Sequence, residues 1–142
     1  MTRNMSDEER RAFLGEGTRT GVLSTVRPDG RPHAAPVWFV LDGDDFVFTT
    51  GRETVKGRNL LRTRQAALTV DDAAPPFAFV TASGRVEISE NLDALLRWAT
   101  VIGGRYMGEH QAEEFGRRNA VPGELLVRLV PTRCIAQAAI AE

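Results

Sequence analysis

Lysine, cysteine and histidine are scarce in this chain, and each shortage narrows the functions that it can have. The single cysteine, Cys134, excludes an internal disulfide and any metal site built from several cysteines. The only histidines, His33 and His110, lie far apart in the sequence and give no support for a zinc site. We therefore expect a protein that binds no metal.

Long apolar runs are also missing. The longest, residues 34–41, is far shorter than the roughly 18 residues that a membrane-spanning helix needs. The charged N-terminus lacks the apolar core of a signal peptide. The sequence thus predicts a cytoplasmic protein with no membrane span.

An excess of charge of either sign is absent as well. The chain has 18 Lys and Arg against 19 Asp and Glu, for a net charge of −1, which argues against general nucleic-acid binding. A length of 142 residues suits one compact domain, and we expect residues 1–142 to form it.

The one lysine, Lys56, lies in the most basic stretch of the chain, residues 51–64, which holds five cations and one acid. All other cations are arginines. A compact ammonium in that background indicates a site that needs a point charge rather than a planar guanidinium. A small anion such as phosphate would suit it. The alternative is a lysine on a solvated helix face, and composition alone does not separate the two.

The order of local patterns predicts a mainly β fold with peripheral helices. Ser6 and Glu9 form a capping box before a short helix. Strands joined by tight turns are expected at residues 20–26, 32–41 and 46–50 as an antiparallel meander, and further strands at 66–70, 77–88 and 124–130. Helices are expected at residues 53–62, 92–102 and 109–118, with Gly103 and Gly104 ending the second. Together they favour a small closed or split β-barrel over a doubly wound parallel sheet.

Two features of the strands refine this expectation. Ser83 and Gly84 within the long strand indicate a bulge or a barrel corner. Cys134 near the last strand is interpreted as a small buried apolar residue.

Motifs for nucleotide hydrolysis, dinucleotide binding and serine or cysteine hydrolysis are incomplete, so those activities are not expected.

The candidate site lies where a strand ends and the basic helix begins. The hydroxyls of Thr49 and Thr50, the amides of a helix N-terminus, and Lys56 or Arg58 would form a phosphate pocket. Trp38 would belong to the core or stack on a cofactor ring. Phe77 and Phe79 share one face of their strand, as core residues or as an aromatic wall for a planar ligand.

The order and spacing of several segments resemble the pyridoxamine 5′-phosphate oxidase-like flavin-binding split barrels. The matching segments cover nearly the whole chain and include residues 21–25, 29–32, 36–39, 48–50, 56–60, 84–88 and 121–126. Within that family the chain is most similar to the actinobacterial, deazaflavin-dependent branch, the flavin/deazaflavin oxidoreductases of group B, which use coenzyme F-420. The resemblance implies a homodimer of FMN-binding-like split barrels with cofactor sites in the clefts between subunits.

The resemblance also implies roles for individual residues. Lys56 and Arg58 would hold the cofactor phosphate, helped by Thr50 and Asn59. Pro36, Val37 and Trp38 would lie along the deazaflavin ring with Thr49 at its edge, and Phe77, Ala78 and Phe79 would come from the other subunit. No catalytic residue is assigned; Tyr106 and solvent both remain candidate proton donors. Contact of Arg62 and Arg64 with the acidic tail of the cofactor also stays open.

The expected activity follows from this resemblance. The chain would be an oxidoreductase that transfers a hydride from reduced coenzyme F-420 to a conjugated, electron-poor substrate such as an enone, a quinone or a tetrapyrrole. One alternative is an FMN-dependent oxidoreductase, because the same phosphate pocket would suit FMN. Another is a flavin or deazaflavin carrier without turnover.

Overall fold

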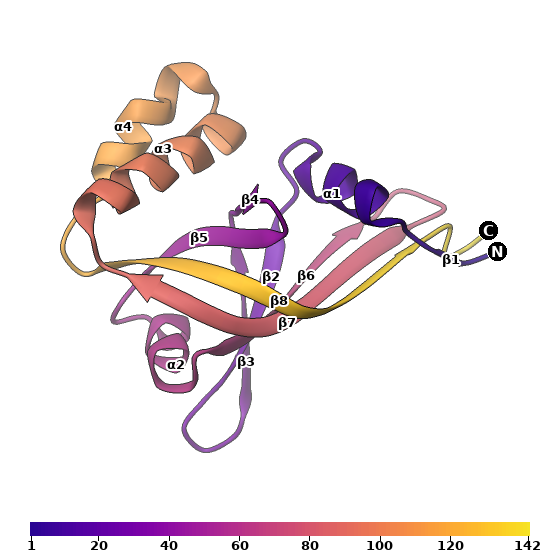
Figure 1. The fold of residues 1–142 in the computed structure, drawn as a ribbon, viewed down its shortest axis with the longest axis horizontal. Helices are drawn as coiled ribbons and strands as arrows, with labels where there is room; N and C mark the ends of the chain where they lie inside the picture. Colours follow the sequence, from indigo (N-terminus) through magenta and orange to yellow (C-terminus); the bar gives the residue numbers. More distant parts are fainter.

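The computed structural model describes all 142 residues and contains one curved antiparallel sheet with four helices around it (Figure 1). The strands are β1 (Arg3–Asn4), β2 (Gly21–Val26), β3 (Pro32–Val37), β4 (Val40–Asp42), β5 (Asp45–Gly51), β6 (Gln65–Asp72), β7 (Ala78–Ser89) and β8 (Glu124–Ala138). The helices are α1 (Asp7–Gly15), α2 (Val55–Thr63), α3 (Leu92–Met107) and α4 (Glu109–Asn119). None of these helices combines the length and apolarity that a bilayer crossing requires.

The sheet is a split barrel rather than a closed one. Its strand order is β3-β2-β6-β7-β8-β5-β4, with β1 paired to β8, so the two edges are β3 and β4. These edge strands follow one another in the chain and are separated only by Trp38 and Phe39. The sheet therefore curls until its edges come close, but they do not pair. The predicted mainly β fold is confirmed.

The predicted antiparallel pairing of the first three strands is present, but the strand expected at residues 32–41 is divided into β3 and β4. β2 pairs with β3 and β4 pairs with β5, but no hydrogen-bond ladder joins β3 to β4. At the break, the Phe39 amide donates to the Tyr106 hydroxyl of α3 (3.2 Å), and the Phe39 ring is fully buried. Backbone groups that a neighbouring strand would satisfy are thus satisfied by a helix from far along the chain.

The two longest strands, β7 and β8, form the backbone of the sheet. Their register shifts between Ser83 and Gly84, so the predicted bulge is confirmed. A Cβ on Gly84 would lie 2.2 Å from the Val130 carbonyl oxygen, which explains why glycine stands there. β8 continues past residue 130, where it was expected to end, because its second half pairs with the first half of β7. Cys134 lies in that second half and is exposed, so its predicted burial is wrong.

Two apolar clusters hold the structure together. The larger fills the barrel and includes Phe39, Phe48 and Leu68, which are fully buried. The smaller joins the outer side of β4, β5 and β8 to α3 and includes Leu95 and Ile102. The paired helices α3 and α4 are thereby fixed to one side of the barrel (Figure 1).

The helix expected at residues 92–102 does not end at Gly103 and Gly104 as predicted. α3 runs on to Met107, and the chain turns at Gly108, whose φ is +100°. A Cβ on Gly103 would lie 2.8 Å from the Phe115 Cβ, so this glycine allows α4 to pack closely instead of ending the helix. The capping box of α1 is confirmed: Ser6 accepts from the Glu9 amide and Glu9 from the Ser6 amide.

Candidate functional site

A cavity of about 510 Å³ opens where the end of β5 meets α2 and the α3–α4 pair. It brings together six of the residues selected from the sequence and adds several from the two helices. Its lining residues are Thr20, Pro36, Val37, Trp38, Thr49, Thr50, Gly51, Lys56, Ile102, Phe115, Asn119 and Glu124. One end is polar and the other is apolar.

The polar end exists because α2 rests directly on the end of β5. A Cβ on Gly57 would lie 2.1 Å from the Gly51 carbonyl oxygen, so only glycine permits this approach. Thr54 caps the helix: its hydroxyl accepts from the Gly57 amide (3.0 Å) and donates to the Gly51 carbonyl (2.7 Å). The buried Thr50 hydroxyl lies 3.3 Å from that of Thr54. Hydroxyls and the positive end of a helix thus face the same space.

Lys56 lies in the first turn of α2 and is half-buried in this cavity. Every ion pair in the structure uses arginine as its cation, and none uses Lys56. No carboxylate therefore lies within ion-pair distance of this ammonium. A half-buried, unpaired ammonium beside hydroxyls and helix amides is suited to hold a phosphate group.

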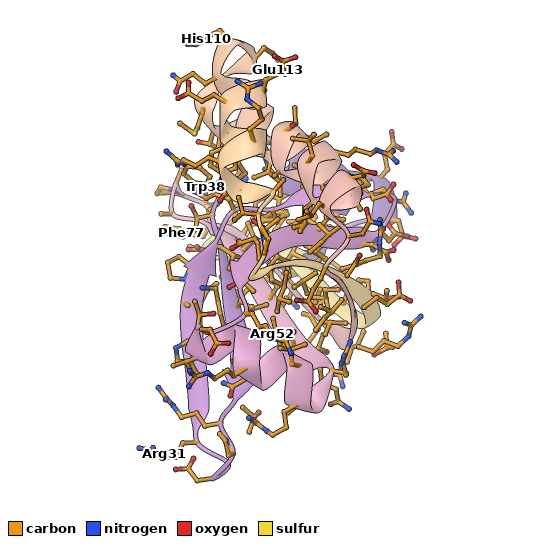
Figure 2. The ribbon with its side chains drawn as sticks, turned by 90° about the vertical axis from the view of Figure 1, so that its left-hand side faces the viewer. Arg31, Trp38, Arg52, Phe77, His110 and Glu113 are labelled. Atoms are coloured by element: carbon orange, nitrogen blue, oxygen red, sulfur yellow. The ribbon has the colours of Figure 1, made fainter.

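The apolar end is built around Trp38. Its ring stacks on Tyr106 with centroids 4.8 Å apart and planes 2° apart, and it lies 5.9 Å from the ring of Phe115. Trp38 is 41% exposed, so it belongs to the wall of the cavity and not to the core. Figure 2 shows it toward the α3–α4 end of the molecule, away from Arg31 on the β2–β3 turn. Pro36 and Val37 extend this wall along β3.

The Tyr106 hydroxyl forms hydrogen bonds with backbone groups. It donates to the Arg19 carbonyl (2.6 Å) and accepts from the Phe39 amide. Burial raises the pKa of Tyr106, while the hydrogen bond from Phe39 acts in the other direction. A phenol held in this way serves the fold, so Tyr106 is a poor candidate for the proton donor.

Arg105 is a structural residue that sequence reasoning missed. Its guanidinium donates to three carbonyl groups, those of Leu14 (2.7 Å), Gly17 (3.0 Å) and Phe39 (2.7 Å). Burial lowers its pKa, and the nearby Arg19 acts in the same direction. Arg105 joins α3 to the end of α1 and to the break between β3 and β4. No local pattern marks it, because its acceptors are distant backbone atoms.

Arg58 and Asn59 lie outside the cavity. Arg58 is exposed and pairs with Glu53 (3.1 Å). Asn59 is buried between α2 and β2, where its amide donates to the Thr25 hydroxyl (3.1 Å). Both line a second hollow of about 320 Å³ whose other residues are Arg27, Pro28, Asp29, Arg31, Val55 and Arg62.

The segment Phe77–Phe79 is also separate from the cavity. Figure 1 places the start of β7 at the end of the molecule where both termini lie, while α2 lies at the other end. Phe77 precedes the strand with φ +68° and is 40% exposed, and Phe79 is only partly buried. The interpretation of these two rings as core residues is therefore wrong.

Glu124 is the second residue that the sequence did not reveal. It begins β8 opposite Gly51, and its half-buried carboxyl lines the cavity that contains Lys56. Burial raises the pKa of Glu124, and the positive charge of Lys56 and a hydrogen bond from Thr49 oppose that rise. Only the pairing of β5 with β8 brings this carboxyl to the end of β5, which local sequence does not show.

Comparison with known protein families matches residues 6–137 to the model of pyridoxamine 5′-phosphate oxidase. The chain belongs to the pyridoxamine 5′-phosphate oxidase family. Members of this oxidoreductase family bind flavins or deazaflavins, which agrees with a cavity that has a polar end and an aromatic wall. A search of curated protein sequences gives no match.

Solved structures with the fold of the pyridoxamine 5′-phosphate oxidase family include several with different names. A conserved hypothetical protein from Mycobacterium tuberculosis is 28% identical, with a TM-score of 0.83 over 95% of this chain and 86% of that one. An F-420 reductase is also 28% identical, with a TM-score of 0.67 over 87% of this chain and 94% of that one. A heme storage protein from Vibrio cholerae is 18% identical (TM-score 0.73; 94% and 96% covered) and shows the fold alone.

Proposed function

We propose that this protein is an oxidoreductase that uses reduced coenzyme F-420 to reduce a conjugated, electron-poor organic substrate such as an enone, a quinone or a tetrapyrrole. The observation that carries the proposal is the cavity at the end of β5. It combines one unpaired ammonium and two hydroxyls at one end with a tryptophan wall at the other. The likeness to an F-420 reductase supports the choice of cofactor.

The residues of the cavity fit a cofactor with a flat ring and a phosphate group. Lys56 and Thr50 would hold the phosphate at the first turn of α2. Pro36, Val37 and Trp38 would support the ring, and Thr49 would lie at its edge. When bound, the reduced deazaflavin supplies a hydride. The protein contributes binding, orientation and a wall that excludes water, and solvent remains the candidate proton source because Tyr106 is held by the backbone.

The outer face of the sheet supports a homodimer. Polar and charged side chains normally cover the solvent side of an antiparallel sheet. Here five residues, one on each of five neighbouring strands, lie directly opposite one another as a row, and none of them is charged. The row consists of Pro36, Val22, Thr69, Thr81 and Ile135. Val22 and Ile135 are 43% and 41% exposed in the single chain. We call this surface the neutral sheet face and propose that a second copy covers it.

A second copy would also complete the cofactor site. The cavity is open, and the start of β7 with Phe77, Ala78 and Phe79 lies at the other end of the same molecule. In a dimer whose clefts lie between subunits, the same segment of the partner would reach the cavity. The exposure of Phe77 suits such a contact.

The decisive experiment is a binding titration that compares coenzyme F-420 with FMN, on protein purified from a host that makes no F-420. Tight F-420 binding, followed by oxidation of the reduced cofactor with enones or quinones, is the expected result. A yellow protein with stoichiometric FMN would instead establish the FMN-dependent alternative. Tight F-420 binding without cofactor oxidation across the panel would establish a carrier.

A further inference from the structure

Glu124 is an acidic side chain in a cavity that otherwise suits an anion. It is the first residue of β8 and lies opposite Gly51, the last residue of β5. A Cβ built on Gly51 would be 4.0 Å from the Glu124 Oε2, so the carboxyl group lies over the end of β5. The Arg52 amide donates to the Gly123 carbonyl (2.8 Å), which fixes the start of β8 beside this strand end. Glu124 is thus held in the site by the pairing of two strands.

The charges in the cavity balance. Among all residues that line it, only Lys56 and Glu124 carry ionisable side chains. The nearby arginines do not contribute: Arg52 pairs with Glu90 (3.0 Å), and Arg58 pairs with Glu53 and lines the other hollow. Within the cavity, an incoming anion therefore meets one ammonium and one carboxyl group. The pair carries no net charge, so the cavity has no surplus of positive charge to offset a second negative charge on the ligand.

This balance separates two kinds of phosphate. A phosphomonoester loses its second proton near a pKa of about 6 and carries nearly two negative charges at neutral pH. A phosphodiester carries one. Repulsion between like charges grows with the charge of the ligand and is strong where water is partly excluded. The carboxyl group of Glu124 therefore weakens the binding of a monoester more than that of a diester.

We propose that Glu124 is the specificity-determining residue that makes the Lys56 cavity prefer a phosphodiester cofactor over a phosphomonoester cofactor. Coenzyme F-420 has a phosphodiester, and FMN has a phosphomonoester. The inference rests on the proposed function for its choice of ligands and explains how the site selects between them.

The test is a fluorescence titration of the wild-type protein and the Glu124→Gln variant with coenzyme F-420 and with FMN. Glutamine keeps the size of the side chain and removes its charge, so the midpoint of thermal unfolding should stay close to that of the wild type. Loss of the charge should increase the affinity for FMN roughly tenfold or more, and that for F-420 by much less. An equal change for the two ligands, or no change for either, overturns the proposal.

Glu53→Gln is the matched control. Glu53 lies just before α2, is exposed and pairs with Arg58 outside the cavity. Its replacement removes the same charge near α2 but outside the cavity, and the preference between the two cofactors should stay as in the wild type. If this variant changes the preference as much as Glu124→Gln does, the effect comes from the general charge of the protein near α2 and the proposal fails.

A second pair of ligands separates this inference from the proposed function. FMN and riboflavin cyclic phosphate share the flavin ring, but the cyclic compound is a diester with one charge. The wild-type protein should prefer the cyclic compound, and Glu124→Gln should remove that preference. If F-420 does not bind but this pattern appears, the proposed function fails and the role of Glu124 stands. If F-420 binds but Glu124→Gln leaves the diester preference intact, the role of Glu124 fails alone.

Discussion

At the scale of single residues, lysine and arginine have different roles in this protein: the arginines stabilise the structure, and the one lysine is left to bind a ligand. Arginines make all the ion pairs, and Arg105 holds three backbone carbonyls with one planar group. Lys56 makes none of these contacts and lies in the cavity. The single lysine is therefore the cation that remains available for a ligand.

The first prediction concerns that lysine. Lys56→Ala should weaken cofactor binding by roughly 1.5–3 kcal/mol, the scale of a charge-assisted hydrogen bond, without unfolding the protein. Fluorescence titration measures the affinity and thermal unfolding checks the fold. Arg52→Ala is the control, because Arg52 belongs to the same basic segment as Lys56 but pairs with Glu90 outside the cavity. Its effect on affinity should be below about 0.5 kcal/mol. Equal losses in the two variants would show that only general charge matters.

The second prediction concerns Arg105. Arg105→Ala leaves three carbonyls without their donor, so we expect the free energy of unfolding to fall by roughly 2–4 kcal/mol. Arg105→Lys keeps the charge but cannot reach three acceptors in one plane, so it should recover only part of the loss. Denaturant unfolding measures both variants. Full recovery by lysine would mean that charge, not the shape of the guanidinium, holds α3 to the end of α1.

At the scale of elements, the site depends on how closely α2 approaches β5. Gly57→Ala would place a methyl group 2.1 Å from the Gly51 carbonyl oxygen and push the helix away. We expect a loss of roughly 1–3 kcal/mol in stability, as for overpacked cores, together with weaker cofactor binding because Lys56 moves with the helix. Gly15→Ala is the control: that glycine ends α1 with open space around it, so the change should be neutral or slightly stabilising. Unchanged affinity in Gly57→Ala would show that the position of α2 is not critical.

Sequence patterns predicted the elements whose determinants are local. The Ser6–Glu9 capping box depends on neighbouring residues and is present. The bulge at Gly84 is also present: the Ser83-Gly84 pair marks it in the sequence, although the close approach that requires glycine is to Val130 of β8. The failures depend on partners far along the chain. Gly103 looked like a helix stop because its role in packing becomes visible only with Phe115 of α4. The break after β3 could not be predicted because Tyr106 of α3 satisfies the backbone there.

The residues of the candidate site also fall into two groups: those that local sequence reveals and those that only distant contacts bring to the cavity. Thr49, Thr50 and Lys56 follow one another closely in sequence, and the structure brings them together in one cavity. Glu124 could not be found from the sequence, because only the register of β5 with β8 brings it there. The segment Phe77–Phe79, at the start of β7, lies at the end of the molecule opposite α2, so its predicted role at the site requires a second copy.

At the scale of the whole molecule, the proposed dimer and the cofactor site should be lost together. Val22→Arg would place a charge within the neutral sheet face, where Val22 lies between Pro36 and Thr69. Burying an unpaired charge between two copies is costly, so we expect a shift from dimer to monomer in sedimentation velocity experiments. Cofactor affinity should fall roughly tenfold or more, because the partner's part of the site is removed.

Val101→Arg provides the comparison that makes this test specific. Val101 is 46% exposed on α3, outside the neutral sheet face, and the same substitution there should leave both association and cofactor binding unchanged. A wild-type protein that sediments as a monomer and still binds the cofactor tightly would contradict the dimer, and the cavity of one chain would then be the complete site. Loss of binding in Val22→Arg without loss of association would instead show that the sheet face acts on the site within one subunit. Joint loss in Val22→Arg alone is the result that only a shared site between two copies explains.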